Sequence, residues 1–509
     1  MNPNTAPLAD DACYLALKTR DARFDGNFFT GVTSTGIYCR PVCSVKTPKR
    51  ENCRFFGHAA QAESAGFRPC LRCRPELAPH SVVWSIQDAS YILAHQAARL
   101  LDEPEAWTDA APSVDLLAAR LGISDRHVRR IFEVQFGVSP VQYLQTRRLL
   151  TAKQLLADTA LPITQIALIS GYASVRRFNA AFVGHYGLNP TQLRRQGATP
   201  SGAGITVKLG YRPPYDVAAM TGFFRKRQIN AIEFVADGAG RMGMGRTFRV
   251  ESGGKVHAGW VHATFDEERC HVVLRISDSL GEVLPLVIRR LRAMLDLDAD
   301  PQAINSALHA SFPGGDGLRV PGAMDGYELA VRAVLGQQIT VAAARTLAQR
   351  MVDKLGEPIT TPWPELTRLF PAAAVLAQAS GDTLGQLGIV RQRQTAIVGI
   401  ALAVAEKRLQ LHGGADVNAT IATLKELPGI GDWTAQYIAM RALRWPDAFP
   451  AGDVALHKAL GVQGLKNPAK EAELASMAWK PWRSYAVIRA WGGAMAQASD
   501  RPAIDALEE

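Results

Sequence analysis

The spacing of hydrophobic positions divides the chain into four stretches with different predicted structure. Residues 1–80 contain only short periodic segments, whereas apolar residues recur at three- and four-residue spacing across 85–196, as on one face of an α-helix. Over 205–300, runs such as 205–209 alternate between apolar and polar positions, which predicts strands interleaved with helical patches. The helical period returns over 301–500. We therefore expect a multidomain, mainly α protein whose third stretch is an α+β unit.

A small, polar segment separates the first two stretches from the last two. Residues 197–204 read Gly-Ala-Thr-Pro-Ser-Gly-Ala-Gly, a composition typical of flexible linkers. At 509 residues the chain also far exceeds the usual domain of roughly 100–150 residues. These features predict two separate modules of two domains each. The expected boundaries are 1–80, 85–196, 205–300 and 301–500.

Composition and charge narrow the class of protein. Hydrophobic residues make up 47% of the chain and charged residues 20%, which is an ordinary globular balance. The formal net charge is +10, and the first 200 residues carry 23 basic against 16 acidic side chains, which suits a polyanionic partner such as nucleic acid. No apolar run approaches the ~20 residues of a membrane span, and the N-terminus lacks the pattern of a signal peptide. We expect a cytoplasmic protein with no membrane partner.

The cysteines are concentrated near the N-terminus, where six of the seven fall within the first 73 residues. Cys39 and Cys43 form one closely spaced pair, and Cys70 and Cys73 form a second pair that is separated from the first by 26 residues. Paired thiolates at this spacing are typical ligands of tetrahedral zinc, whereas disulfides are rare in a reducing cytosol. The pattern predicts one Zn²⁺ ion bound by four cysteines. Spacing by itself favours a purely structural zinc site.

The sequence around these pairs resembles a known family. Residues 31–43 (GVTSTGIYCRPVC) and 65–75 (AGFRPCLRCRP) resemble the N-terminal domain of the Ada family of alkylation-response regulators. The resemblance implies that Cys39 is both a zinc ligand and the acceptor of a methyl group from a methylphosphotriester in DNA. A zinc-bound thiolate stays deprotonated and nucleophilic, which makes this chemistry reasonable. A plain structural zinc module without methyl transfer is the alternative.

Two helix-turn-helix signatures lie about 50 residues apart in the all-α stretch. The first has a helix ending near Gly122 and a second helix starting after Ser124; the other starts its second helix after Ser174. Their spacing resembles the DNA-binding domain of the AraC family, which implies that outward side chains of both second helices contact DNA. The predicted contacts are Arg126, Arg129, Arg130, Arg176 and Arg177. For any one of these arginines, a solvated helix face is an equally good interpretation.

The C-terminal stretch contains a hairpin motif followed by an isolated carboxylate. Residues 427–435 (LPGIGDWTA) form a helix-hairpin-helix motif, in which Gly429 and Gly431 permit a tight turn whose backbone N–H groups bind a DNA phosphate. Asp453 lies about twenty residues further on, where glycosylases of the helix-hairpin-helix superfamily keep their catalytic aspartate. A helix N-cap is the alternative role for Asp453, because it follows Gly452 and precedes an apolar run.

The wider sequence resembles AlkA-type 3-methyladenine DNA glycosylases over essentially 205–495. The resemblance rests on 211–216 (YRPPYD), 330–338 (AVRAVLGQQ) and 479–486 (WKPWRSYA). It implies that Asp453 is catalytic and that Gln338, a leucine in AlkA itself, fills the space left when the damaged base leaves the stack. It also implies an aromatic base pocket, for which core packing is the alternative role. The pocket residues would be Trp433, Tyr437, Trp491 and Phe223.

Residues that are missing restrict the chemistry further. Trp433 stands where bifunctional relatives carry a Schiff-base lysine, which favours a monofunctional enzyme. No cysteine follows Cys270, so the four-cysteine iron–sulfur cluster of some relatives is not expected, and no Pro-Cys-His-Arg motif of a second methyltransferase is present. The leading hypothesis is a glycosylase for N-alkylated bases in double-stranded DNA, fused to a methyl-accepting transcription regulator that contacts RNA polymerase at its promoters. The alternative is a regulator whose C-terminal half only holds damaged DNA.

Overall fold

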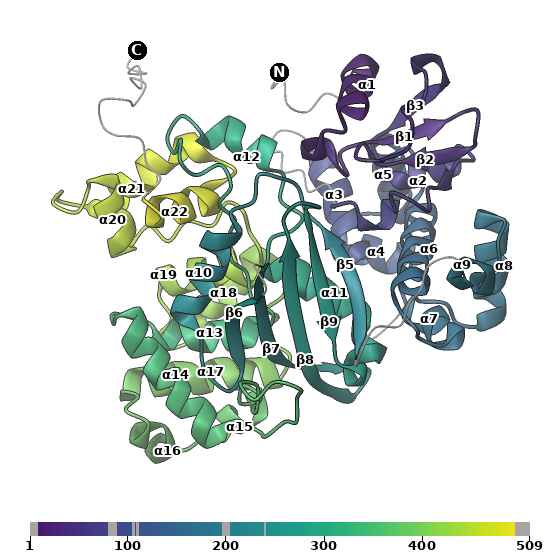
Figure 1. The fold of residues 1–509 in the computed structure, drawn as a ribbon. Helices are drawn as coiled ribbons and strands as arrows, with labels where there is room; N and C mark the ends of the chain where they lie inside the picture. Colours follow the sequence, from purple (N-terminus) through teal and green to yellow (C-terminus); the bar gives the residue numbers. More distant parts are fainter. Residues whose placement is uncertain are drawn as a thin grey trace, which may run out of the picture.

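The arrangement of the chain is seen in a computed structural model. It describes residues 9–79, 89–103, 107, 111–195, 204–238 and 241–493, so nearly all of the predicted linker 197–204 lies outside the described residues. Helices predominate, and two small antiparallel-rich sheets lie among them (Figure 1). Within the described ranges, every helix is too short or too polar to cross a membrane. The predicted mainly α, multidomain fold is confirmed.

The N-terminal segment is a small α+β unit with little hydrophobic core. Its sheet has the strand order β3-β1-β2-β4, in which only the β2–β4 pair is parallel. Its largest apolar cluster contains few side chains, among them Phe29, Tyr38 and Phe67. A unit with so small a core needs a further constraint such as a metal ion. The elements are α1 (Asp10–Thr19), η1 (Ala22–Phe24), β1 (Phe29–Val32), β2 (Ile37–Cys39), η2 (Arg50–Asn52), β3 (Cys53–Phe56), α2 (Ala59–Ser64), β4 (Arg68–Pro69) and η3 (Pro75–Leu77).

Seven α-helices follow within the part of the chain that the structure describes, and helix ends lie at the predicted positions Gly122, Ser124 and Ser174. Gly122 ends one helix with a left-handed φ of 66°, and the side chain of Ser124 caps the next by accepting a hydrogen bond from the His127 N–H. Ser174 caps the corresponding helix of the second unit in the same way. The helices are α3 (Ala89–Asp102), α4 (Val114–Leu121), α5 (Asp125–Phe136), α6 (Pro140–Asp158), α7 (Ile163–Ile169), α8 (Val175–Tyr186) and α9 (Pro190–Arg195).

The third stretch is the predicted α+β unit. Its five strands are all antiparallel to their neighbours and follow the order β5-β9-β8-β7-β6, so that β5 and β6 form the two edges. Helix α10 packs beside β6, and helix α11 follows the last strand. The elements are β5 (Ile205–Gly210), α10 (Val217–Arg227), β6 (Glu233–Gly238), β7 (Arg241–Ser252), β8 (Lys255–Asp266), β9 (His271–Ile276), η5 (Asp278–Val283) and α11 (Leu284–Met294).

The C-terminal stretch is a helical bundle around the largest hydrophobic cluster of the described chain. Its central helix α13 is buried along most of its length and contacts α14, α17 and α19. The elements are α12 (Pro301–Leu308), α13 (Gly326–Leu335), α14 (Val341–Leu355), α15 (Ala373–Ala377), α16 (Gly381–Gln386), α17 (Arg391–Ala405), α18 (Val417–Glu426), α19 (Asp432–Arg441), α20 (Val454–Leu460), α21 (Pro468–Ala475), η6 (Ser476–Trp479) and α22 (Arg483–Trp491).

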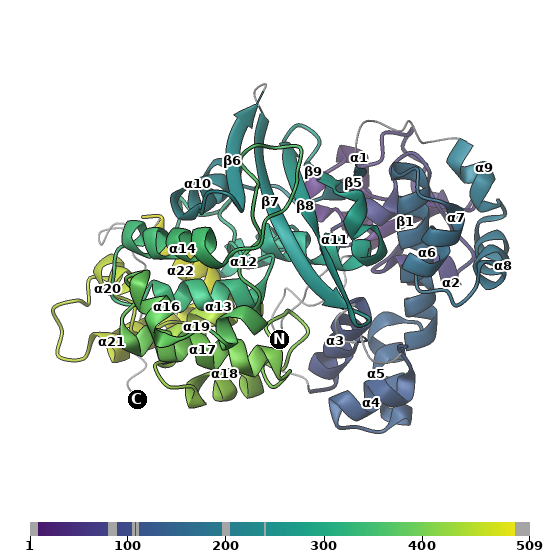
Figure 2. The same ribbon diagram turned by 90° about the horizontal axis from the view of Figure 1, so that it is seen from below.

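The two predicted modules do not have separate cores. One continuous cluster contains Leu155 of α6 and Phe178 of α8 together with Val207 of β5 and Leu274 of β9, all four of them fully buried. Helix α6 therefore packs directly on the edge strand β5 (Figures 1 and 2). The halves before and after the predicted linker bury apolar side chains in one common hydrophobic core. Linker composition predicts flexibility of the connection, but it carries no information on whether the joined surfaces bury each other.

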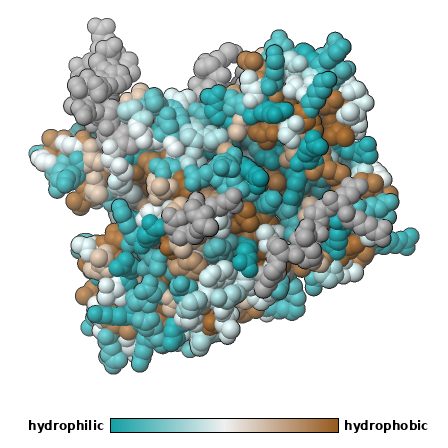
Figure 3. All heavy atoms as spheres, in the orientation of Figure 1, coloured by the Kyte–Doolittle hydropathy of each residue, from teal (hydrophilic) through white to brown (hydrophobic). Residues whose placement is uncertain are grey.

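The surface in Figure 3 is largely hydrophilic, with hydrophobic side chains in scattered groups.

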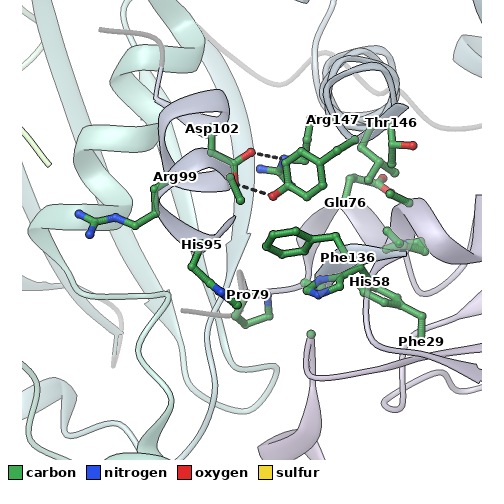
Figure 4. Close-up of a pocket in the computed structure, with 18 of the residues that line it drawn as sticks. Phe29, His58, Glu76, Pro79, His95, Arg99, Asp102, Phe136, Thr146 and Arg147 are labelled. Carbon is green, nitrogen blue, oxygen red and sulfur yellow. Dashed lines mark hydrogen bonds and ion pairs between the residues drawn. The ribbon is translucent and has the colours of Figure 1, made fainter. Parts of the chain in front are cut away.

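A small cavity of about 100 Å³ lies where the N-terminal segment meets α3, α5 and α6 (Figure 4). The ring of Phe136 contacts two imidazoles, with centroid distances of 4.9 Å to His58 and 5.1 Å to His95. On the opposite wall, the Asp102 carboxylate accepts hydrogen bonds from the Tyr143 hydroxyl and the Arg147 guanidinium, at 2.9 and 2.8 Å. Burial lowers the pKa of His58 to about 4.

We expect acid to weaken this junction through His58. Because the folded protein keeps the imidazole neutral down to about pH 4, the unfolded chain binds the extra proton between roughly pH 6.5 and 4. The free energy of unfolding therefore falls as the pH drops through this window, by up to about 3 kcal/mol from this group. A His58→Phe variant should show a shallower loss of stability between pH 6.5 and 4 in urea titrations. Equal pH slopes for the variant and the parent would contradict this assignment.

Candidate functional site

Four cysteines converge at one end of the N-terminal sheet. Cys39 is the last residue of β2, and Cys43 lies in the turn that follows, where its N–H donates to the Arg40 carbonyl. The Cys70 N–H donates to the Tyr38 carbonyl, which brings the second cysteine pair beside the first. The four sulfur atoms, including that of Cys73, all lie within 4.8 Å of one another. Sulfurs bound to one zinc at about 2.3 Å would be roughly 3.8 Å apart, so the cluster fits a tetrahedral ion.

The four cysteines change each other's pKa values in opposite directions, so a cation would be needed to keep all four deprotonated. The hydrogen bond with Cys43 raises the pKa of Cys39, and the hydrogen bond with Cys39 raises the pKa of Cys73. The hydrogen bond between Cys43 and Cys39 lowers the pKa of Cys43 to about 7. The thiols therefore cannot all be thiolates near neutral pH unless a metal ion binds them. Three of these cysteines are buried, including Cys39 at 6% exposure, and Cys73 is the most exposed.

The second helices of both helix-turn-helix units present the predicted cations to solvent. Val128 and Phe132 of α5, and Phe178 and Phe182 of α8, are fully buried, which fixes the opposite face of each helix outward. His127 is half-buried and bonds to Arg130. The exposed cations are Arg126, Arg129 and Arg130 on α5 and Arg176 and Arg177 on α8.

The predicted hairpin joins α18 to α19. Gly429 has a φ of +85°, and an added Cβ would lie 3.2 Å from the Ala396 side chain, so both the turn and its close packing require glycine. Gln337, which the sequence motifs did not single out, donates hydrogen bonds of 2.9 Å to the Gly429 carbonyl and to the Thr434 hydroxyl. Gln337 thereby joins the hairpin to the loop that carries Gln338. Gln338 is exposed at a φ of 55° and does not line the adjoining cavity.

Asp453 is both the N-cap of α20 and part of a large cavity. One carboxylate oxygen accepts hydrogen bonds from the Leu456 N–H at 2.7 Å and the Trp491 indole N–H at 3.0 Å. The other oxygen accepts from the Trp433 indole N–H at 3.0 Å. The two predicted roles are therefore not exclusive. Three N–H donors orient the carboxylate.

The cavity beside Asp453 has a volume of about 1270 Å³ and is lined by all four predicted aromatic residues. Trp433 and Tyr437 are stacked, with ring centroids 5.3 Å apart, and Trp491 lies 6.4 Å from Tyr437. Phe223 is different, because the guanidinium groups of Arg227 and Arg441 lie over its ring at 3.7 and 4.8 Å.

Arg227 and Arg441 also line the cavity beside Phe223 and Tyr437, a part of its wall that we call the cavity floor. Arg441 donates a 2.5 Å hydrogen bond to the Tyr437 hydroxyl and two more to the Pro321 and Gly322 carbonyls. Burial by itself would raise the pKa of Tyr437, but the charges of Arg441 and Arg227 outweigh it and lower that pKa. The sequence analysis missed both arginines. The detectable signal was their position four residues after Phe223 and Tyr437, which places each pair on one helix face.

The hydrogen bond from the Trp433 indole to Asp453 can be tested by substitution. Trp433→Phe keeps an aromatic ring in the cavity but removes one N–H donor from the Asp453 carboxylate, and a hydrogen bond to a charged group contributes about 1.5–3 kcal/mol. If the oriented carboxylate acts in the reaction, the rate of the chemical step in single-turnover assays should fall by roughly 10- to 100-fold. Trp479→Phe is the matched control, because its indole N–H donates to Ser311 instead. A loss of equal size in both variants would show a general packing effect.

Comparison with known families assigns each stretch of the chain. Residues 12–76 match the metal binding domain of Ada, and 117–196 match a helix-turn-helix domain. Residues 206–325 match the AlkA N-terminal domain, and 331–484 match the HhH-GPD superfamily of base excision DNA repair proteins. The combination defines a DNA repair protein with a zinc-containing, DNA-binding regulatory half.

Individual relatives cover either the whole chain or one half. A "Probable bifunctional transcriptional activator/DNA repair enzyme AlkA" of Mycobacterium tuberculosis is 36% identical over 94% of this chain and 96% of its own length. The DNA-3-methyladenine glycosylase 2 of Escherichia coli is 34% identical over 56% of this chain and 95% of its own length. AdaA of Bacillus subtilis, a bifunctional transcriptional activator/DNA repair enzyme, is 32% identical over 38% of this chain and 86% of its own. The chain belongs to the family of bifunctional activator/repair proteins in which an Ada-type half is fused to an AlkA-type half.

Proposed function

We propose that this protein excises N-alkylated bases of the 3-methyladenine type from double-stranded DNA as a monofunctional glycosylase. We further propose that it accepts methyl groups at Cys39 and regulates transcription. The observation that carries the glycosylase proposal is the Asp453 carboxylate, held by three N–H donors at the edge of an aromatic cavity. Membership of the activator/repair family supports both activities. The proposed domains are 1–80, 85–196, 205–300 and 301–500.

Asp453 acts on the sugar and not on the base. N-alkylation gives the base a positive charge, so the bond from C1′ to the base nitrogen can break with its electron pair leaving on the base and without prior protonation. The sugar then becomes positively charged, and the Asp453 carboxylate stabilises it electrostatically. Water adds to C1′ and gives up its proton, which the carboxylate can accept. The base and a DNA abasic site are the products.

The residues in and around the cavity have different roles in binding the base. Trp433 and Trp491 lie beside the carboxylate and offer electron-rich faces to a cationic base. Tyr437 stacks on Trp433 and adds a further aromatic face. The ring of Phe223 is engaged with two guanidinium groups, so we assign it to shaping the cavity floor. Gln338, exposed at the cavity edge, would fill the gap in the duplex, while Gly429 and Gly431 present backbone N–H groups to a phosphate.

In the N-terminal segment, Cys39, Cys43, Cys70 and Cys73 bind one zinc ion, which keeps their thiols deprotonated at neutral pH. The Cys39 sulfur attacks the methyl carbon of a phosphotriester, forming an S–C bond as the C–O bond breaks. The released electron pair stays on the phosphate, which becomes an ordinary diester. Each chain can perform this transfer once, because the thioether formed is stable.

The helix-turn-helix units supply DNA recognition. We propose that Arg126, Arg129 and Arg130 on α5, with Arg176 and Arg177 on α8, contact DNA, and that the bound protein recruits RNA polymerase at its promoters. Their exposure on capped helices of the expected geometry supports these contacts. A cytoplasmic location follows from the DNA substrate.

One pair of assays tests the proposal with the full chain. Duplex DNA treated with a methylating agent should release 3-methyladenine, measured by chromatography; failure to release it would favour a regulator with a DNA-holding C-terminal half. DNA carrying labelled methylphosphotriesters should transfer its label to protein, and peptide mass spectrometry should place the methyl group on Cys39. Label on another cysteine, or none, would leave the zinc site a structural module.

A further inference from the structure

The five-stranded sheet lies between helix α6 of the helix-turn-helix half and helix α10 beside the base cavity. Helix α6, which connects the helix-turn-helix units, packs on the edge strand β5, whereas α10, which lines the base cavity, packs on the opposite edge strand β6. Adjacent strands are about 4.8 Å apart, so the two edges are separated by roughly 19 Å of sheet. In both ribbon views, α8 and α9 lie at one end of the molecule and α14 and α20 at the other (Figures 1 and 2).

Buried polar contacts fix this separation. Arg212 is fully buried in the junction, where its guanidinium donates to the Asp25 carbonyl at 2.7 Å and the Pro79 carbonyl at 3.2 Å, and also to the Asp298 and Ala299 carbonyls. These four acceptors come from both halves of the chain.

Two further contacts extend the junction. Gln154 of α6 donates to the Lys208 carbonyl at 3.0 Å, and Arg99 of α3 donates to the Gly413 carbonyl at 2.7 Å. Separating the halves would break these hydrogen bonds and expose the apolar side chains that both halves bury together, which costs free energy. These contacts therefore favour one fixed orientation of the halves.

Neither DNA-binding surface is used in the junction. The cations of α5 and α8 are exposed, and none of the ion pairs found among the described residues includes Arg126, Arg129, Arg130, Arg176 or Arg177. On the other side, Gln338 and Gly431 are exposed, and the 1270 Å³ cavity between α10, α14 and α20 is free of the helix-turn-helix units. Both surfaces can accept DNA at the same time.

The stiffness of DNA decides how many segments are needed. The persistence length of duplex DNA is about 150 base pairs, so a sharp bend within a few tens of base pairs requires elastic energy that protein contacts must offset. A short duplex on α8, at one end of the molecule, would have to bend to reach the base cavity beside α14 and α20 at the other end (Figures 1 and 2). A second duplex, or a distant part of the same DNA joined by a loop, reaches it without this cost.

We propose that one chain binds two separate DNA segments at once, holding one at the helix-turn-helix surface while its glycosylase cavity samples another. This inference rests on the proposed DNA-binding function of both halves. It predicts that a promoter-bound molecule repairs DNA brought near it in space and does not repair the duplex immediately beside its own site. The two activities would then not compete for one stretch of DNA.

A bridging assay with the full chain tests this inference. Beads carry an undamaged 30-base-pair duplex, and a fluorescent 25-base-pair duplex with a central tetrahydrofuran abasic site is added at low salt. The full chain should retain at least tenfold more fluorescence on the beads than two surface variants. One variant combines Arg126→Ala, Arg130→Ala and Arg177→Ala; the other, Gly431→Asp, places a negative charge at the hairpin, where an added side chain meets nothing within 4 Å.

The outcomes separate the possible failures. If the full chain binds each duplex separately but does not bridge them, the two surfaces share one DNA and the inference is wrong. If it binds neither duplex, the proposed function fails as well. A mixture of the two variants should not bridge, because each has lost one surface. Bridging by that mixture would mean that two copies of the chain act together, which also overturns the inference for a single chain.

Discussion

Asp453→Asn should lower the rate of base release from methylated duplex DNA by about three orders of magnitude. A carboxylate roughly 4 Å from a unit positive charge, at an effective dielectric constant of about 20, contributes about 4 kcal/mol of stabilisation, which corresponds to a factor of about a thousand. The neutral amide of asparagine lacks this charge but has nearly the same shape. Single-turnover release of 3-methyladenine, measured with the enzyme in excess, reports the chemical step directly.

The fold should survive this substitution, which makes the result interpretable. The oxygen of the introduced amide would still accept the Leu456 N–H, because asparagine and aspartate are comparable N-caps. Binding to a duplex with a tetrahydrofuran abasic site should therefore stay within a few-fold of the parent. Asp416→Asn is the matched control, since Asp416 caps α18 through the Ala419 N–H and lies outside the cavity. Near-normal release by Asp453→Asn would remove the carboxylate from the mechanism and favour the DNA-holding alternative.

Features of the fold that depend on local sequence could be predicted. Ser124 and Ser174 cap their helices as expected, because a cap depends on a hydroxyl and a backbone N–H three residues apart. The four cysteines meet in space because pairs at such spacing each form half of a tetrahedral site. For Asp453, the resemblance to helix-hairpin-helix glycosylases implied a place in the site, and Asp453 does line the cavity.

Contacts between distant segments could not be predicted in the same way. Nothing near Arg212 in the sequence indicates that it binds carbonyls of Asp25 and Pro79, more than 130 residues away. The common core of α6, α8 and the sheet could not be predicted from the sequence either. An apolar helix face has the same sequence pattern whichever surface covers it. The ring of Phe223 matched an aromatic pocket position, but its second guanidinium partner, Arg441, comes from a distant helix, α19. Such pairings depend on tertiary packing.

Loss of one zinc ligand should have the largest effect on stability. We expect Cys43→Ser to reduce the zinc content from one ion per chain to near zero, as measured by inductively coupled plasma mass spectrometry. Structural zinc sites contribute about 10–16 kcal/mol of apparent binding free energy near pH 7, and the small core of residues 9–79 cannot replace it. The segment should unfold and become the first site of cleavage in limited proteolysis.

The damage should spread to the helix-turn-helix units more than to the glycosylase cavity. Glu76 forms buried ion pairs with Arg74 and Lys153, and Arg74 also pairs with Asp158 at the end of α6, so unfolding leaves charges on α6 without partners. The cavity lies at the opposite edge of the sheet, and base release should remain within a few-fold of the parent. Cys53→Ser is the matched control, because Cys53 is equally buried but lies outside the cluster. Retention of one zinc ion by Cys43→Ser would show that the cluster is not the metal site.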